Sequence, residues 1–153
     1  MNNTQRLLLD QMDRKMQLFA PTYEISNPPT GWIKATRTAL GMSLEQLGTR
    51  LDMTKQGVMK LEAREANGTL TVKNLKEAAR ALDMTLVYGL IPKDGSLDAL
   101  IERKAKDLAR QIVSRTSTTM TLEEQANSPE RINKAIEERA ISLKHEMPKI
   151  LWD

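Results

Sequence analysis

Residues 37–62 read RTALGMSLEQLGTRLDMTKQGVMKLE, and this stretch predicts two short helices joined by a tight turn. Ser43 can cap the first helix and Thr54 the second, because a hydroxyl oxygen accepts from the unpaired N–H groups of a first helical turn. Leucines recur at helical spacing in the first helix, and Val58 and Leu61 do so in the second. Two apolar stripes this close in sequence are buried together only if the helices cross and share one core.

Crossed helices of this length form a helix-turn-helix, a layout that places its second helix in the DNA major groove. Successive side chains of that helix are about 100° apart. Val58, Leu61 and Glu62 therefore face the core. Gln56 and Lys60 face outward, where a double helix would lie.

The outward face carries groups that suit base edges. Gln pairs bidentately with adenine and Lys pairs with guanine acceptors or phosphate, so Gln56 and Lys60 are candidate base readers. Met59 lies at the edge of this face and can touch a thymine methyl, and Lys55 lies in the first turn, near a passing phosphate or base. The alternative is a polar, solvated face on an ordinary helix pair.

Four residues are expected at DNA phosphates. Ser43 and Thr54 offer hydroxyl groups at the two helix starts. Lys73 and Asn74 fall in the first turn of a further helix predicted over 72–82, where lysine and backbone N–H groups often hold phosphate.

The same stretch resembles the repressor-type helix-turn-helix of phage repressors and the Xre regulators. The matching positions, which precede the segment LKEAARALDM, are Arg37, Leu40, Gly41, Ser43, Leu47, Leu51, Thr54, Gln56, Val58, Leu61 and Glu62. The resemblance implies an Arg37–Glu62 ion pair that sets the angle of the recognition helix. Two positions depart from the pattern: Leu44 replaces a phosphate-contacting glutamine, and Gly57 weakens its helix by roughly 1 kcal/mol relative to alanine.

Residues 20–125 also resemble a narrower group named mobile mystery protein A. The shared features are GWIKATRTALGMSLEQLG, the LVYGLIP run and a helical tail. Members are small regulators encoded on mobile elements beside a Fic-domain partner. The resemblance implies an antitoxin-like regulator of its own operon, paired with a Fic-type protein.

Composition limits the remaining classes. The chain has 153 residues, 40% of them hydrophobic but only five aromatic, so aliphatic and methionine side chains must fill its core. It has no cysteine, which excludes thiol chemistry and is compatible with a reducing cytoplasm. No apolar run approaches the roughly 20 residues that span a bilayer. We expect a cytoplasmic protein.

The excess positive charge lies on the helix-turn-helix segment. Residues 31–92 hold nine basic and six acidic side chains, whereas 1–30 and 93–153 are each balanced. A basic excess on one module is typical of a DNA contact.

No catalytic or metal-binding constellation is visible. His145 is the only histidine, which argues against a zinc site, and we expect no cofactor. The pairs Glu123/Glu124 and Glu137/Glu138 are adjacent in sequence, so their side chains diverge on a helix and mark solvated faces. We expect no enzymatic activity.

These patterns predict an all-α protein in three segments. Residues 1–30 form an N-terminal helix and linker, 31–92 a repressor-like helix-turn-helix domain of about five helices, and 93–153 a helical C-terminal extension. Trp32 is expected to anchor the core of the domain. Thr121 to Glu124 reads as a capping box that opens a short helix after a break at 116–119.

Residues 85–91, TLVYGLI, predict one short β-strand, which would need another strand to pair with. That strand can come from a second copy of the chain or from a partner protein, and the alternative is an ordinary buried extended segment. The helices of 93–153 also need a surface to bury against: each other, the N-terminal helix, a second copy or another protein.

The first hypothesis is therefore a sequence-specific DNA-binding transcriptional repressor. Dimerisation is expected, because two half-sites one DNA turn apart add their contacts on a palindromic operator. The second hypothesis is a protein-interaction module that neutralises or scaffolds a partner protein, with DNA binding secondary.

Overall fold

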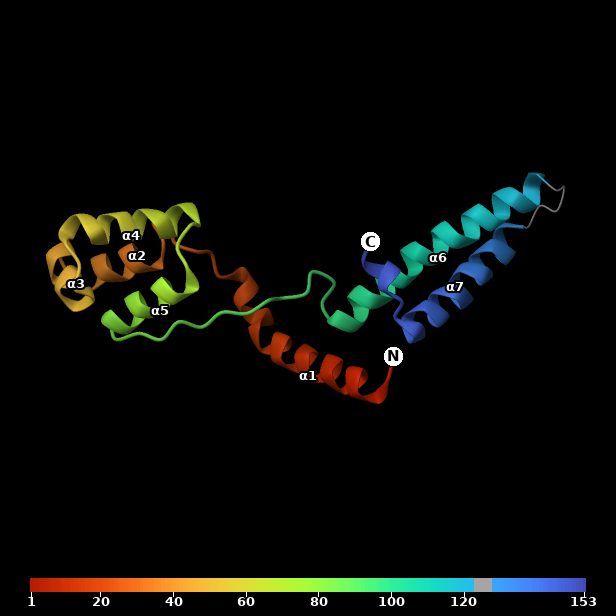
Figure 1. Cartoon of the computed structure of the whole chain (residues 1–153), viewed down its shortest axis with the longest axis horizontal. Coiled ribbons are helices and arrows are strands. Elements are labelled where there is room, and N and C mark those ends of the chain that lie inside the picture. Colours follow the sequence, from red (N-terminus) through yellow and green to blue (C-terminus); the bar gives the residue numbers. More distant parts are fainter. Residues whose placement is uncertain (123–127) are drawn as a thin grey trace. The chain divides into compact units, whose positions relative to one another are not determined.

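The computed structural model describes residues 1–122 and 128–153, with side chains assigned outside 119–127 (Figure 1). The α-helices are α1 (Asn3–Phe19), α2 (Trp32–Ala39), α3 (Leu44–Leu51), α4 (Lys55–Asn67), α5 (Val72–Ala81), α6 (Leu97–Leu122) and α7 (Pro129–Glu146). Two short 3-10 helices complete the regular structure, η1 (Ala20–Glu24) and η2 (Lys149–Trp152). The predicted all-α fold is confirmed.

The chain divides into two compact units. One unit is 24–88, and the other combines 1–23 with 89–153. The sequence suggested three successive segments, but the structure groups the N-terminal helix with the C-terminal ones. The reason is a set of long-range contacts between α1 and α6 that no local pattern in the sequence records.

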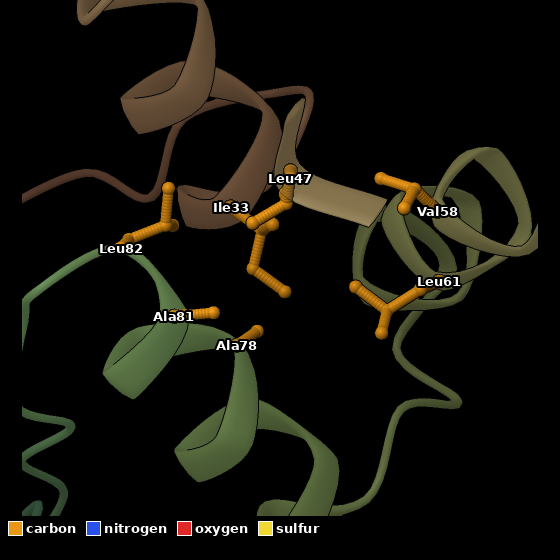
Figure 2. Packing of buried hydrophobic residues seen from close by; sticks show 7 residues of the cluster. All are labelled: Ile33, Leu47, Val58, Leu61, Ala78, Ala81 and Leu82. Atoms are coloured by element: carbon orange, nitrogen blue, oxygen red, sulfur yellow. The ribbon is translucent and has the colours of Figure 1, made fainter. Parts of the chain in front are cut away.

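The unit 24–88 is a four-helix domain around one aliphatic core. Figure 2 shows side chains from α2, α3, α4 and α5 pointing toward one another. The buried members are Ile33, Leu47, Val58, Leu61, Ala78, Ala81 and Leu82. Each helix contributes to a shared interior, so burial in this unit depends on all four helices being in place.

Side chains at the helix starts explain where three of the four helices begin. Ser43 Oγ accepts from the Gln46 amide at 3.1 Å, and Gln46 Oε1 accepts from the Ser43 amide at 2.8 Å, which completes a capping box at α3. Thr54 and Thr71 cap α4 and α5 in the same way, accepting from amides three residues ahead. These caps satisfy donors that the helices cannot pair internally.

Three expectations for this domain are corrected. It has four helices, α2 to α5, where the sequence suggested about five. Trp32 is 49% exposed and Ile33 is buried in its place, because the residue after the helix start turns inward. Residues 85–91 form no strand, because the described part of the chain contains no other strand with which they could pair. Most of their side chains are exposed.

The other unit is built on a helical hairpin of α6 and α7. Its seam contains Ala105 and Ala109 of α6 and Ala140 of α7, all buried, with Leu143 and Leu151 closing one end. Small side chains allow two helix backbones to approach closely, so the seam is narrow. The expected break at 116–119 is absent, since α6 continues to Leu122. The capping box at Thr121–Glu124 extends into residues outside the described part.

Polar contacts attach α1 to this hairpin. Asp13 accepts from the first amides of α6, those of Leu97 at 2.6 Å and Asp98 at 3.3 Å. Gln17 donates to the Gly95 carbonyl at 2.7 Å, and the N-terminal ammonium of Met1 donates to the His145 carbonyl. No residue of α1 is buried, so these polar contacts hold a helix that has no apolar core of its own.

Candidate nucleic-acid interface

The turn between α3 and α4 sets how these two helices cross. Asp52 adopts a left-handed conformation with φ 54° and ends α3. The Met53 amide then bonds to the Gly48 carbonyl at 2.8 Å, and a Cβ on Gly48 would lie 2.6 Å from the Met53 carbonyl oxygen. Gly48 is therefore required by the close approach of the chain in this turn.

Helix α4 has one buried face and one exposed face. Val58, Leu61 and Glu62 are buried. Gln56 and Lys60 are exposed, as the helical spacing indicated. Because the inner face is enclosed by three other helices, the outer face is presented on a rigid support.

Two ties connect α4 to α2. At the end of α2, Arg37 donates through Nε to Glu62 Oε1 at 2.5 Å and through Nη2 to Glu62 Oε2 at 3.2 Å. Both side chains are largely buried, 12% and 6% exposed, and Arg37 also donates to the Met42 carbonyl. The hydrogen bond with Glu62 is the main reason that the pKa of Arg37 lies above its ordinary value. This is the contact that the family resemblance implied.

The second tie was not anticipated from the sequence. Glu65 accepts from the Trp32 amide and from the Ile33 amide, each at 2.8 Å, and so caps the start of α2 from one turn further along α4. Gly31 makes room for it, because a Cβ there would lie 2.7 Å from Glu65 Oε1. A signal existed in the sequence: Gly31 precedes α2 without any capping side chain of its own.

Helix α4 is thus held to both ends of α2 through Glu62 and Glu65, which lie three residues apart on the same face. Each carboxylate receives two hydrogen bonds from α2. Charge-assisted, bidentate contacts are geometrically restrictive, so this pair of ties fixes the orientation of α4 more closely than apolar packing alone.

Lys55, at the start of α4, already has a partner in the free protein. Its Nζ lies 3.4 Å from Glu45 Oε1 in the first turn of α3, and both side chains are about half exposed. A hydrogen bond from the backbone amide of Glu45, and then Lys55, place the pKa of the Glu45 carboxyl below its ordinary value. The pair is solvated and therefore easily exchanged for a phosphate contact.

The hydroxyls of Ser43 and Thr54 are used first as helix caps. Each oxygen accepts a backbone bond, and both side chains are exposed, so each O–H remains able to donate outward. Met59 is 51% exposed on the outer face of α4. The chemistry available along α4 is thus an amide, an ammonium, a thioether and a cap hydroxyl.

Lys73 and Asn74 lie in the first turn of α5, next to the cap of Thr71. Lys73 is exposed and Asn74 is half-buried. Within the described part of the chain, no hydrogen bond or ion pair links either side chain to α4. The predicted phosphate residues are therefore distributed over the starts of three helices.

The two departures from the family pattern have structural accounts. Leu44 is half-buried against the domain core, so this position packs and cannot contact phosphate as a glutamine does. Gly57 lies in the first turn of α4, where a Cβ would be 3.3 Å from the Thr54 hydroxyl that caps the helix. A side chain there would press on the cap.

Other chemistry is not assembled in the regions that the structure covers. No group of three or more histidine, aspartate or glutamate side chains in 1–122 and 128–153 could hold a metal ion. His145, Glu137 and Glu138 are exposed, and Glu123 and Glu124 lie outside the described residues. No helix of the described residues is long and apolar enough to cross a membrane.

Comparison with known families agrees with this geometry. A family model described as helix-turn-helix matches residues 33–88. The match covers α2 to α5, so this part of the chain is a helix-turn-helix domain, and it supports a DNA-binding regulator. Comparisons with curated proteins and with solved structures gave no match.

Proposed function

Taking the helix-turn-helix domain as the premise, we propose that this chain is a sequence-specific transcriptional repressor that binds DNA as a homodimer. The observation that carries the proposal is the exposed row of Gln56, Met59 and Lys60 on α4. The opposite face of the same helix is held in the core by Val58 and Leu61. A reading surface needs this combination, because base recognition requires side chains to be placed accurately on a rigid element.

Within this function the residues divide into two roles. Gln56 and Lys60 would read base edges in the major groove, with Met59 supplying an apolar contact to thymine. Lys73 and the hydroxyl of Ser43 would hold phosphates, which position the domain without carrying sequence information.

Three further residues complete the assignment. Lys55 would leave Glu45 for a phosphate or a base edge. Thr54 and Asn74, at the starts of their helices, would contact phosphates of the DNA backbone. Since the Lys55–Glu45 pair is exposed, breaking it costs little.

The biological setting we propose follows the resemblance to the mobile mystery protein A group. The chain would act in the cytoplasm as an antitoxin-like autoregulator of an operon that also encodes a Fic-type partner. A palindromic operator would match the two-fold symmetry of a dimer, with half-sites about one helical turn of DNA apart.

The direct test is fluorescence anisotropy with DNA from immediately upstream of the gene, beside a scrambled duplex, at two salt concentrations. We expect a preference for the upstream DNA that persists at the higher salt, because base contacts depend less on counterion release than phosphate contacts do. Equal and salt-labile binding to both duplexes would reject the proposal.

Variants separate the two roles. Gln56→Ala and Lys60→Ala should each weaken binding to the preferred DNA by about 1–3 kcal/mol and barely change binding to the scrambled duplex. Lys73→Ala should weaken binding to both and reduce the salt slope by about 1. Lys134→Ala, which removes an exposed lysine from α7, serves as the control. If Gln56→Ala and Lys60→Ala weaken both duplexes equally, the base-reading role is wrong.

A second candidate function is a protein-interaction module, and α1 favours it. Leu7, Leu8 and Leu18 are more than half exposed, although leucine is usually buried. Co-purification with the product of the neighbouring gene at high salt would distinguish the functions, because electrostatic DNA binding fades under those conditions and an apolar interface persists.

A further inference from the structure

Residues 84–92, which follow α5, form neither helix nor strand (Figure 1). Most of their apolar side chains are exposed. Val87 is 75% exposed, Tyr88 64% and Leu90 77%. Single exposed apolar residues are common, but three within four positions of a β-prone sequence are not. This segment has the composition of a strand and lacks the neighbour that a strand requires.

The backbone of the same segment is also unpaired. Across the described residues, no hydrogen bond involves an N–H or C=O group of residues 85–91. Unpaired backbone with alternating apolar side chains is a template for pairing with another strand.

We propose that residues 85–91 pair with the same residues of a second copy, antiparallel and with Tyr88 on the two-fold axis. In this register Leu86 lies opposite Leu90 of the second copy, and Thr85 lies opposite Ile91. Leu86, Tyr88 and Leu90 then share one face, because alternate residues of a strand point the same way. Two copies together form a continuous apolar face of leucine and tyrosine.

Charge complementarity favours a second copy of the chain as the pairing partner, and it favours this register. Asp83 and Lys93 are exposed and flank the segment, one five residues before Tyr88 and the other five residues after it. Pairing about Tyr88 therefore brings each Asp83 near the Lys93 of the other copy, twice in the dimer. Pairing about Val87 or Gly89 brings neither charge opposite the other.

These charges determine the register of the strand pairing more than they strengthen it. Asp83 already contacts Arg50 of its own chain at 3.2 Å, and its side chain is 84% exposed, so its pairs are strongly screened. Opposite charges at both ends still disfavour slipped pairings, which would leave Asp83 and Lys93 without each other as partners.

Phe19 supplies an apolar neighbour on the other face. Its ring lies against Gly89, since a Cβ on Gly89 would be 2.9 Å from it. Residues directly opposite in an antiparallel pair share a face, so Val87 of the second copy would lie beside this ring. Aromatic and β-branched side chains paired across strands stabilise a sheet, and an aromatic ring over a strand glycine compensates for its missing side chain.

The purpose of this pairing rests on the proposed function, since a dimer presents two recognition helices to DNA. Its evidence is the exposed segment itself. The test can therefore be made without DNA.

The chain contains no cysteine, so single cysteines report proximity without background. After mild oxidation, Tyr88→Cys should form a disulfide-linked dimer, because the Cα atoms of directly opposed residues lie within the range that a disulfide spans. Val87→Cys and Leu90→Cys are matched controls from the same exposed segment. Each would face a different residue in the second copy and should cross-link at least about tenfold more slowly.

Sedimentation of the full chain gives the second measurement. The natural chain should sediment at twice the chain mass, and Tyr88→Lys and Tyr88→Glu should each sediment at the mass of a monomer. An equal mixture of the two variants should regain the dimer mass, because opposite charges then meet at the axis. Circular dichroism checks that the helices are intact, as expected for an exposed position.

A natural chain that is monomeric, or equal cross-linking at all three positions, would overturn the proposal. So would a dimer that the Tyr88 charge variants leave intact. A Tyr88-linked dimer that binds no DNA would remove the proposed function and leave this inference standing. Sequence-specific DNA binding by a dimer that the Tyr88 charge variants leave intact would do the reverse.

Discussion

The two units of this chain bury apolar surface in different ways. In residues 24–88, four helices enclose branched aliphatic side chains such as Ile33, Leu47 and Val58. In the other unit, three buried alanines line the seam between α6 and α7, with Leu143 and Leu151 at one end, and α1 has no buried residue. Both units also leave large apolar side chains exposed, such as Leu40 in the first and Leu7, Leu8 and Leu18 in the second.

The unit 24–88 encloses the larger share of buried branched side chains. A domain that encloses its large side chains gains most of its stability internally, since each fully buried aliphatic group contributes about 1.5–3 kcal/mol. A seam of alanines buries much less area per residue. The unit around the hairpin encloses fewer large aliphatic side chains, and polar contacts from Asp13 and Gln17 help to join α1 to it.

One device is common to both units. The start of α2 is capped by Glu65 from α4, and the start of α6 is capped by Asp13 from α1. In each case a carboxylate from another helix accepts from unpaired amides of the first helical turn, and at α6 it does so beside the local cap Ser96. The cap then also acts as a tertiary tie, because it joins two helices distant in sequence.

The largest effect should come from the buried ion pair of the helix-turn-helix unit. Glu62→Ala leaves the Arg37 guanidinium largely buried without its partner, which should lower the free energy of unfolding of residues 24–88 by about 3–5 kcal/mol. Trp32 lies in this unit and Trp152 in the other, so urea unfolding followed by fluorescence in a Trp152→Phe background reports the first alone.

The control for this prediction is Glu77→Ala, which removes an exposed carboxylate from α5. Its effect should stay within about 0.5 kcal/mol, as is usual for surface substitutions. If both variants lose the same stability, the ion pair does not distinguish this unit.

A smaller loss should follow overpacking of the alanine seam. Ala109 is fully buried between α6 and α7, and Ala109→Leu must push the helices apart. We expect a loss of about 1–3 kcal/mol in the unit that contains the hairpin. Trp152 fluorescence in a Trp32→Phe background measures it. Arg110→Leu introduces the same side chain on the exposed face and should change little; an equal loss there would show that overpacking of the seam is not the cause.

The cap from Glu65 should contribute about 1 kcal/mol, the usual value for a helix cap. Glu65→Ala frees the Trp32 and Ile33 amides, whose hydrogen exchange should accelerate, and Glu65→Gln should give an intermediate result because one acceptor remains. Thr71→Ala removes the cap of α5 and is the control: it should lower stability comparably and leave those two amides unchanged. Unaltered exchange in Glu65→Ala would disprove the tie.

The smallest effect concerns pH and the surface charges of the hairpin unit. Hydrogen bonds from Arg103 and from Lys106 lower the pKa values of Asp94 and Glu102 below their ordinary 3.8 and 4.5. Lowered carboxyl pKa values stabilise the fold above those ordinary values, and this stabilisation is lost as the pH falls through the lowered ones. Thermal unfolding between pH 6 and pH 3 should show only a modest decline in the melting temperature, because both ion pairs are exposed and screened by solvent. Arg103→Gln should flatten it; an identical slope would contradict the assignment.

The helices of the helix-turn-helix domain could be predicted because the sequence signals that mark them are local. Ser43, Thr54 and Thr71 lie where caps belong, and the period of Val58, Leu61 and Glu62 separates the two faces of α4. The burial observed along α4 follows this period. Local chemistry is sufficient when it decides where a helix starts and which face it buries.

Predictions failed where the outcome depended on a distant neighbour. TLVYGLI has the propensity of a strand, but a strand needs an edge to pair with, and the described parts of one chain supply none. Trp32 looked like the core anchor because it is large, whereas the register of α2 buries Ile33. The role of Glu65 depends on the end of α4 meeting the start of α2, which no short window of sequence contains.

The all-α fold and the outward face of α4 could be read from local sequence, because caps and periodicity act over three or four residues. The helix-turn-helix layout followed from the same local signals. Tertiary structure alone decided that α1 joins the C-terminal hairpin and that Glu65 ties α4 to α2. It also left residues 85–91 unpaired. These outcomes depend on which surfaces meet after the chain has folded, and the energies involved come from contacts between residues far apart in sequence.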